Sequence, residues 1–209
     1  MSKKRYPPRV PRHGNGFRAQ SLRALPRGAW WVKRWLQAIE EMRLGARAGR
    51  GRVYAEQGQV TMLEVDGGHV EAKVLGARPE PYTVKIDFEQ FTPPDDGGLD
   101  LMSMGRILAG EMPSSLEEMF SKAGRSPYPT PGADRFWCSC PDWSKPCKHI
   151  AAVLYQLGDV LVREPALLLR LRGLPLPEGA IASALPLWKG ETRLDDALGK
   201  IYRRTGFGG

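Results

Sequence analysis

The three cysteines of this 209-residue chain lie in one short stretch, which also holds one of its three histidines. Their pattern is Cys-x-Cys, a gap of six residues, then Cys-x-His, and the candidate ligands are Cys138, Cys140, Cys147 and His149. Thiolate sulfur and imidazole nitrogen suit a tetrahedral zinc ion, and the two pairs can meet if the chain reverses between them. An odd number of cysteines also favours metal ligation over a disulfide framework. The pattern therefore predicts one zinc site.

Four protein ligands fill a tetrahedral zinc ion and leave no position for water, so the predicted ion is structural and not catalytic. Two other chemistries fit less well, because a Cys–His nucleophile pair needs an orienting third group and a redox pair is typically spaced Cys-x-x-Cys. Unligated core cysteines are a further alternative, which the neighbouring Ser, Pro, Asp and Lys residues disfavour. We therefore expect a protein that is not an enzyme and has no small-molecule substrate.

Two elements must hold the four ligands. The first pair ends an expected strand at 135–138, and the second pair opens an expected helix, whose apolar residues recur at helical spacing as far as Leu161. We interpret residues 136–161 as a ββα zinc knuckle closed by a helix N-terminus. Three thiolates and one neutral imidazole leave the zinc shell negatively charged, and Lys145, Lys148 and helix amides can offset that charge.

The net charge of +8 is concentrated near the N-terminus. Residues 1–52 hold fourteen lysines and arginines against two glutamates, a balance of +12, which leaves −4 for the remaining residues. Within this part, residues 1–28 mix basic side chains with Pro and Gly and hold no acidic one, so we expect a disordered arm. Such an arm can follow a phosphate backbone, although a solubilising tail has the same composition.

An amphipathic helix is predicted for residues 29–44, because apolar residues recur there at helical spacing. The helix contains a cluster of tryptophans at Trp30, Trp31 and Trp35. These rings can belong to the core or form a base-stacking platform, and their helical spacing favours the core. Lys33 and Arg34 are then expected on the outer surface.

Short segments between residues 52 and 88 alternate apolar and polar side chains, which is the pattern of half-buried strands. We expect a small antiparallel sheet, a barrel-like meander of three or four strands. A Pro- and Gly-rich linker at 92–98 precedes two expected helices, at 101–108 and 114–124. The predicted fold class is therefore α+β, with a meander, a zinc knuckle and several short helices.

The leucine-rich residues 166–172 predict a short helix that either completes the core or forms a partner surface. The segments expected along the chain are a basic arm at 1–28, a helix and meander at 29–91, a helical segment with the zinc knuckle at 99–172, and a loop-rich tail with a short helix at 173–209. No run of eighteen apolar residues occurs and the N-terminal residues are polar, so we expect neither a membrane span nor a secretory signal. Together with the cysteine usage, this favours a cytoplasmic protein.

The runs from Cys138 to Trp143 and from Pro146 to Tyr155 resemble the SWIM zinc finger, whose pattern is Cys-x-Cys, a variable gap and Cys-x-His. The wider chain is similar to the small bacterial SWIM proteins in four places: Gly28 to Trp35, Gly51 to Tyr54, the strand pair before Pro79, and Pro165 to Arg172. The resemblance implies that the three cysteines and His149 are the zinc ligands and that the protein binds DNA or protein partners. It also implies a link to ATP-dependent helicases of the Swi/Snf type. The chain itself has no Gly-x-x-x-x-Gly-Lys-Ser/Thr phosphate loop.

Two functions stay open at this point. The first is a non-enzymatic accessory protein that binds nucleic acid, with DNA favoured, through the basic arm and with the zinc finger as a scaffold. The second is a protein-interaction module that serves a Swi/Snf-type helicase partner and does not itself bind nucleic acid. The candidate nucleic-acid-binding residues of the first are Lys3, Lys4, Arg5, Arg9, Arg12, Arg18, Arg23, Arg27, Lys33, Arg34, Lys145 and Lys148.

Overall fold

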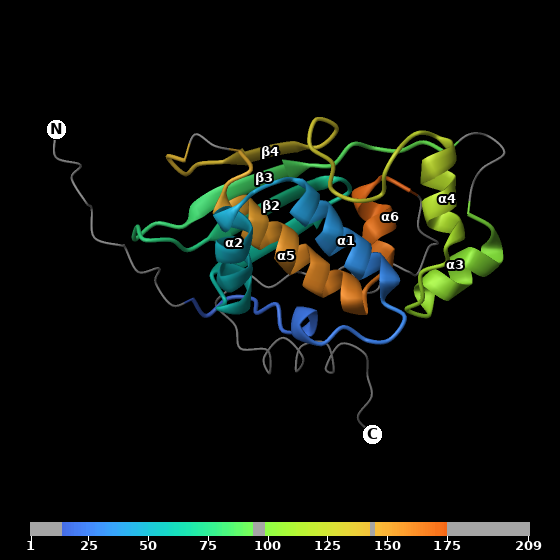
Figure 1. Ribbon diagram of the computed structural model, residues 1–209, viewed down its shortest axis with the longest axis horizontal. Coiled ribbons are helices and arrows are strands. Elements are labelled where there is room, and N and C mark those ends of the chain that lie inside the picture. Colours follow the sequence, from blue (N-terminus) through green and yellow to red (C-terminus); the bar gives the residue numbers. More distant parts are fainter. Residues whose placement is uncertain (1–13, 94–98, 143–144, 175–209) are drawn as a thin grey trace, which may run out of the picture.

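The computed structural model describes residues 14–93, 99–142 and 145–174 (Figure 1). Helices and strands follow one another in the order expected of an α+β fold, with a short 3-10 helix, η1, at the start. The elements are η1 (Ser21–Arg23), α1 (Trp30–Glu41), α2 (Ala46–Glu56), β1 (Val60–Asp66), β2 (His69–Val74), β3 (Tyr82–Asp87), α3 (Leu101–Leu108), α4 (Ser115–Lys122), β4 (Arg135–Cys138), α5 (Lys148–Arg163) and α6 (Ala166–Leu171). None of the helices in the described ranges is long and apolar enough to cross a membrane.

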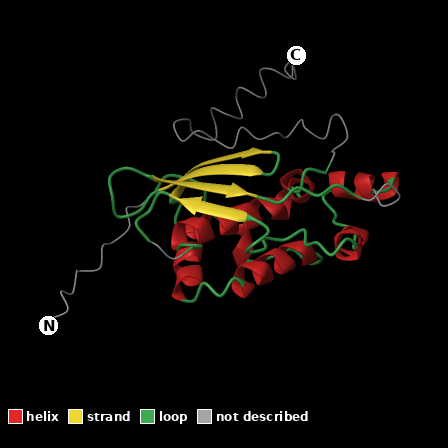
Figure 2. Ribbon diagram, turned by 90° about the horizontal axis from the view of Figure 1, so that it is seen from above, coloured by secondary structure: helices red, strands yellow, loops and turns green. Residues whose placement is uncertain are grey.

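The four strands form one antiparallel sheet in the order β1-β2-β3-β4. Strands β1 to β3 are the predicted meander, whereas β4 joins from far along the chain and pairs Cys138 with Val84 and Phe136 with Ile86. The helices lie on one side of the sheet (Figure 2). The meander and the zinc segment therefore share one sheet, which the sequence left open.

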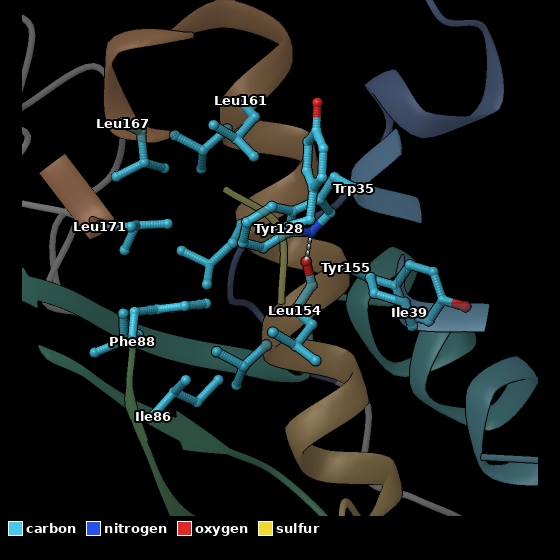
Figure 3. Close-up of a cluster of buried hydrophobic side chains, with 14 of the residues drawn as sticks. Trp35, Ile39, Ile86, Phe88, Tyr128, Leu154, Tyr155, Leu161, Leu167 and Leu171 are labelled. Atoms are coloured by element: carbon cyan, nitrogen blue, oxygen red, sulfur yellow. Dashed lines mark hydrogen bonds between the residues drawn. The ribbon is translucent and has the colours of Figure 1, made fainter. Parts of the chain in front are cut away.

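The core lies between the sheet and α5, which contacts all four strands. Every residue of α5 from His149 to Leu161 is buried, so this helix is enclosed by α1, α2 and the sheet. The indole N–H of Trp35 donates to Leu154 O at 2.8 Å (Figure 3), and that of Trp31 donates to Leu161 O at 2.9 Å. The preference for the core is confirmed for Trp35, which is fully buried, and for Trp31, which is 7% exposed, whereas Trp30 is partly buried.

The leucine-rich helix α6 also belongs to the core. Its four leucines, Leu167, Leu168, Leu169 and Leu171, are all buried. Of the two readings of this segment, completion of the core is the one that the structure supports. The tail predicted from residue 173 onward, with its helix at 194–202, lies almost wholly outside the described residues.

Helix α2 was not predicted from the sequence, which was interpreted as entering strands at about residue 52. Gly49 and Gly51 lower the helix propensity of this segment and interrupt its apolar pattern. Packing overrides propensity here, because Gly51 lies against α5: a Cβ at this position would be 2.5 Å from the Cβ of Ala151. The missing side chain lets the two helices approach closely.

The prediction of a disordered arm over residues 1–28 is wrong for residues 14–28. The backbone N–H of Gly16 donates to Gly58 O at 2.9 Å, and Phe17 bridges to Val60, the first residue of β1. Leu22 is buried, and the N–H of Ser21 donates to the Asp159 carboxylate on α5 at 2.7 Å. All charged side chains of residues 1–28 are basic. Residues 14–28 are nevertheless ordered, because their few apolar side chains and their backbone N–H groups contact the folded protein. Residues 1–13 lie outside the described residues.

Candidate metal centre

The structure brings the four predicted ligands together where β4 ends and α5 begins. Cys138 is the last residue of β4, and Cys147 is the N-cap of α5, with His149 in the first turn of that helix. The three Sγ atoms and one imidazole nitrogen all lie within 4.8 Å of one another. All four side chains are buried, the most exposed being Cys140 at 8%. The predicted arrangement of a strand end and a helix entry is therefore present.

The spacing of the ligand atoms fits a zinc ion. His149 Nδ1 lies 3.8 Å from both Cys138 Sγ and Cys147 Sγ. With Zn–S bonds of about 2.3 Å and Zn–N bonds of about 2.0 Å, tetrahedral geometry requires S···N separations of about 3.5 Å. The two Nδ1···Sγ separations lie within a few tenths of an ångström of this value, which favours Nδ1 as the ligating nitrogen. The donor set, the burial and the spacing together fit one structural zinc.

Hydrogen bonds among the four side chains favour one thiolate, at Cys147. The Cys138 thiol donates to Cys147 and, with smaller contributions from His149 and the N–H of Ile150, lowers the Cys147 pKa to about 3. The same hydrogen bond, together with burial, raises the pKa of Cys138. Burial is the main cause of the raised pKa of Cys140. Zinc binding must therefore displace protons from buried thiols, which couples metal affinity to pH.

Two tyrosines hold the ligating imidazole in place. The ring of Tyr82 on β3 stacks on His149 with centroids 4.5 Å apart, and Tyr54 on α2 meets it edge-on at 5.6 Å. Gly76 makes room for this stack, because a Cβ there would be 2.5 Å from the Tyr82 ring. Sequence reasoning did not assign a role to either tyrosine. The signal was present in the Gly51 to Tyr54 run, whose glycine permits the α2–α5 contact and whose tyrosine reaches the imidazole.

The second imidazole nitrogen, Nε2, is buried and has no hydrogen-bond partner among the residues that the structure describes. Ligating histidines usually donate this N–H to a carboxylate, a carbonyl or a water molecule. In this chain the ring is fixed by aromatic packing, so its orientation depends on Tyr54 and Tyr82.

The two lysines predicted beside the metal contact the site indirectly. Lys145 Nζ donates to the carbonyl oxygen of Cys138 at 2.8 Å, and Lys148 Nζ lies over the Tyr54 ring, 5.4 Å from its centroid. Each lysine thus supports a residue that forms or flanks the ligand shell.

The other predicted nucleic-acid contacts are dispersed. Arg34 on α1 forms an ion pair with Glu117 at 2.6 Å, and Arg23 pairs with Glu56 at 2.9 Å. Arg18, Arg27 and Lys33 are exposed. The remaining predicted contacts lie outside the described residues and are Lys3, Lys4, Arg5, Arg9 and Arg12.

Comparisons with known proteins agree with the site. Residues 135–158, from the start of β4 into α5, match the family model of the SWIM zinc finger. The chain is 36% identical over 175 residues to the uncharacterized protein Rv2102 of Mycobacterium tuberculosis, a match that covers 80% of this chain and 63% of the relative. The chain thus spans less than two thirds of that relative's length. No solved structure matches. Residues 135–158 are therefore similar to a SWIM zinc finger and hold four ligands that fit one structural zinc ion.

Proposed function

We propose that this protein binds nucleic acid, with DNA favoured, as a non-enzymatic accessory protein whose zinc finger is the scaffold of the binding surface. The observation that carries the proposal is the position of α2. The fold places this arginine-bearing helix against α5, so Arg47 and Arg50 lie beside the finger, although they are about a hundred residues earlier in sequence. The finger alone has few basic residues, and α2 supplies the missing charge.

Contacts around Tyr54 support this placement. Tyr54 meets the ligating His149 on one side, and the ammonium group of Lys148 lies over its ring. Burial raises the Tyr54 pKa, and the positive charge of Arg50 lowers it in part, so Arg50 acts on the same hydroxyl. Arg47 reaches Asp142 in the finger loop at 3.4 Å. The resulting cluster of Arg47, Arg50 and Lys148 is here called the finger-side cluster.

Two members of the finger-side cluster are available for phosphate. Among the described residues Arg50 donates only to the backbone oxygen of Ala46, and Lys148 contacts only an aromatic ring. Neither forms an ion pair with a described acidic side chain. Phosphate contacts by such side chains release counterions and give binding that weakens steeply with salt. The basic residues of 1–13 would add further sequence-independent affinity.

The test is a salt titration of the full chain with a labelled DNA duplex. Each lost phosphate contact should reduce the slope of log affinity against log salt by about 0.9. The double variant Arg50→Gln with Lys148→Gln should therefore lose about two contacts, a slope change of about 1.8. Lys122→Gln on α4 is the matched control, because that lysine is exposed and α4 lies at the opposite end of the molecule from α2 (Figure 1).

A truncation that starts at residue 14 measures the contribution of the basic N-terminus. The deletion should stop there, because residues 14–28 pack on the core and a longer deletion would also damage the fold. Absence of binding to any duplex or single strand at low salt would refute the proposal. An affinity that changes neither with salt concentration nor with any of these variants would also refute the proposal.

A second candidate function is a protein-interaction module, for which a partner of the Swi/Snf helicase type is the family-based proposal. The apolar surface of α3 favours it: Leu101 is 87% exposed, Met102 77% and Leu108 48%. Helix α3 lies with α4 at one end of the molecule, beyond α1 (Figure 1). Exposed apolar groups gathered on one helix are typical of partner surfaces.

Pull-down with the native chain and with Leu101→Glu separates the two functions. A stoichiometric partner that is retained by the native chain and lost with Leu101→Glu would support the interaction module. Unchanged DNA binding by Leu101→Glu would show that the two surfaces act independently.

A further inference from the structure

Among the residues that the structure describes, Trp137 is the one exposed large aromatic side chain. It lies on β4, directly before the ligand Cys138, and is 51% exposed, whereas the core tryptophan Trp35 is fully buried. Side chains alternate between the two faces of a strand. Because Cys138 is buried toward the helices, Trp137 stands on the opposite, outer face of the sheet.

The neighbours of Trp137 on that face include two cations. The strand register places Lys85 of β3 directly opposite Trp137, and Arg135 lies two residues earlier on the same strand, with its side chain 84% exposed. Both have acidic partners: Lys85 lies 3.3 Å from Glu71, and Arg135 lies 3.9 Å from Asp87. Exposed ion pairs of this kind contribute about 0–1 kcal/mol. A phosphate can therefore compete for either cation.

The backbone around Trp137 is held by pairing with β3 and by the metal centre that follows it. The N–H of Ser139 donates to Thr83 O at 3.0 Å, and the N–H of Thr83 donates to Ser139 Oγ at 3.0 Å. The next residue, Cys138, is a ligand of the metal centre, and its carbonyl accepts from Lys145. The indole therefore projects from a rigid position, so a ligand that binds it need not order the backbone first.

We infer that Trp137 is a base-stacking platform for single-stranded nucleic acid, flanked by Arg135 and Lys85 as phosphate contacts. The inference rests on the proposed nucleic-acid-binding function and names the form of nucleic acid that the outer sheet face takes. A base in a duplex is already stacked on both sides, whereas an unpaired base has a free face for an indole. A half-exposed aromatic ring between two cations suits the single strand.

The experiment measures binding of the full, zinc-loaded chain to a fluorescent single-stranded oligonucleotide and to the matching duplex. Stacking of one base on an aromatic side chain is worth about 1–3 kcal/mol. Trp137→Ala should therefore weaken single-strand binding by about fivefold to 150-fold and leave duplex binding unchanged. The salt slope should stay constant, because stacking releases no counterions, and Trp137→Phe should retain most of the affinity.

Arg135→Gln supplies the complementary readout. It should reduce the single-strand salt slope by about 0.7, the value for one phosphate contact with a single strand. Zinc content and circular dichroism of each variant show whether the fold is intact.

Three outcomes would overturn the inference. In the first, Trp137→Ala leaves single-strand affinity unchanged while the finger-side variants still weaken duplex binding; the proposed function then stands without this site. In the second, Trp137→Ala weakens both forms equally. In the third, Trp137→Ala abolishes capture of a protein partner and leaves the oligonucleotides unaffected, which makes the indole a protein contact. Absence of binding by the unmodified chain would refute the proposed function itself.

Discussion

Strand β4 is held at its two ends by buried polar centres of different kinds. Asp134 directly precedes the strand and forms an ion pair with Arg172 at 2.7 Å, with side chains 0% and 3% exposed. Cys138 ends the strand and belongs to the metal centre. Only three residues, 135–137, therefore separate an ion-pair centre built wholly from protein groups from a centre whose side chains suit a metal ion.

The ion-pair centre is complete within the chain. Both carboxylate oxygens of Asp134 accept from Arg172, and they also accept from the backbone N–H groups of Glu89 and Thr130. Arg172 in turn donates to the carbonyl oxygens of Tyr128 and Pro127 and to Glu89 O. A buried charge pair is tolerated when its remaining hydrogen bonds are satisfied. At this end of β4, folding requires nothing from outside.

The metal centre lacks that independence. Three sulfurs and one imidazole nitrogen converge on one point, and zinc is the partner that satisfies them all. The contrast suggests that one end of β4 depends on metal supply and the other does not. Single substitutions at each end can test this difference directly.

The largest effect is expected at the metal end. Cys147→Ser, or removal of zinc with a chelator, should abolish metal binding and unfold β4 and the start of α5, because structural zinc contributes about 10–16 kcal/mol of apparent binding free energy in zinc-finger peptides. Metal analysis should fall from one zinc per chain to none, and thermal unfolding should move to lower temperature. Unchanged circular dichroism and thermal stability after confirmed zinc loss would contradict the expectation that this end of β4 depends on zinc.

A smaller but still large effect is expected at the ion-pair end. Arg172→Met leaves a buried carboxylate without its cation, which typically costs about 3–5 kcal/mol. The carbonyl oxygens that Arg172 satisfies also lose their donor, so a double variant with Asp134→Leu should recover only part of the loss. Urea unfolding measures the change in free energy of unfolding.

Zinc content distinguishes the two ends. The Arg172→Met variant should still bind one zinc per chain under folding conditions, in contrast to Cys147→Ser. Loss of zinc at the ion-pair end would mean that the two centres form one cooperative unit.

The two centres also differ in how visible they are in the sequence. The metal ligands are chemically distinctive and lie within one short stretch, so residue type and spacing were enough to find them. Arg172 and Asp134 are ordinary surface residue types, separated by 38 positions. No local pattern marks such a pair, because its partners meet only when the sheet and α6 have packed.

The same reasoning explains which parts of the fold were predicted. Periodicity indicated α5 and the strands of the meander, since their apolar residues face one shared core. Helix α2 was not predicted because its buried face consists of only Gly51, Tyr54 and Ala55, which do not form an apolar stripe. The roles of Tyr54 and Tyr82 depend on contacts between remote elements, which a linear pattern does not contain.

Gly51 and Gly49 of α2 provide a matched pair of substitutions that test how α2 supports the metal centre. Gly51→Ala should push α2 away from α5 and cost about 1–3 kcal/mol, because the new methyl group would collide with Ala151 and with Lys148 O. Gly49→Ala on the same helix meets nothing within 4 Å and should stabilise the protein by about 0.5–1 kcal/mol through helix propensity. Thermal unfolding of the two variants should thus shift in opposite directions.

The pair also tests the support of the ligating imidazole. Displacement of α2 by Gly51→Ala moves Tyr54 away from His149, so zinc affinity measured against a competing chelator should fall. Gly49→Ala should leave it unchanged. Equal zinc affinity in the two variants would mean that Tyr82 alone is enough to orient the ring.

The smallest effect is expected at Lys145, the side chain that ties the finger loop to the end of β4. Lys145→Met removes one hydrogen bond to Cys138 O while keeping a similar side-chain length, and the cost should be about 0.5–1.5 kcal/mol. Because Lys145 is exposed, water can replace the lost donor, which places the expected value at the low end. Lys122→Met, on α4, controls for the loss of one charge. A cost above about 2 kcal/mol, beyond the usual range for one hydrogen bond, would mean that the metal end of β4 depends on its loop as well as on zinc.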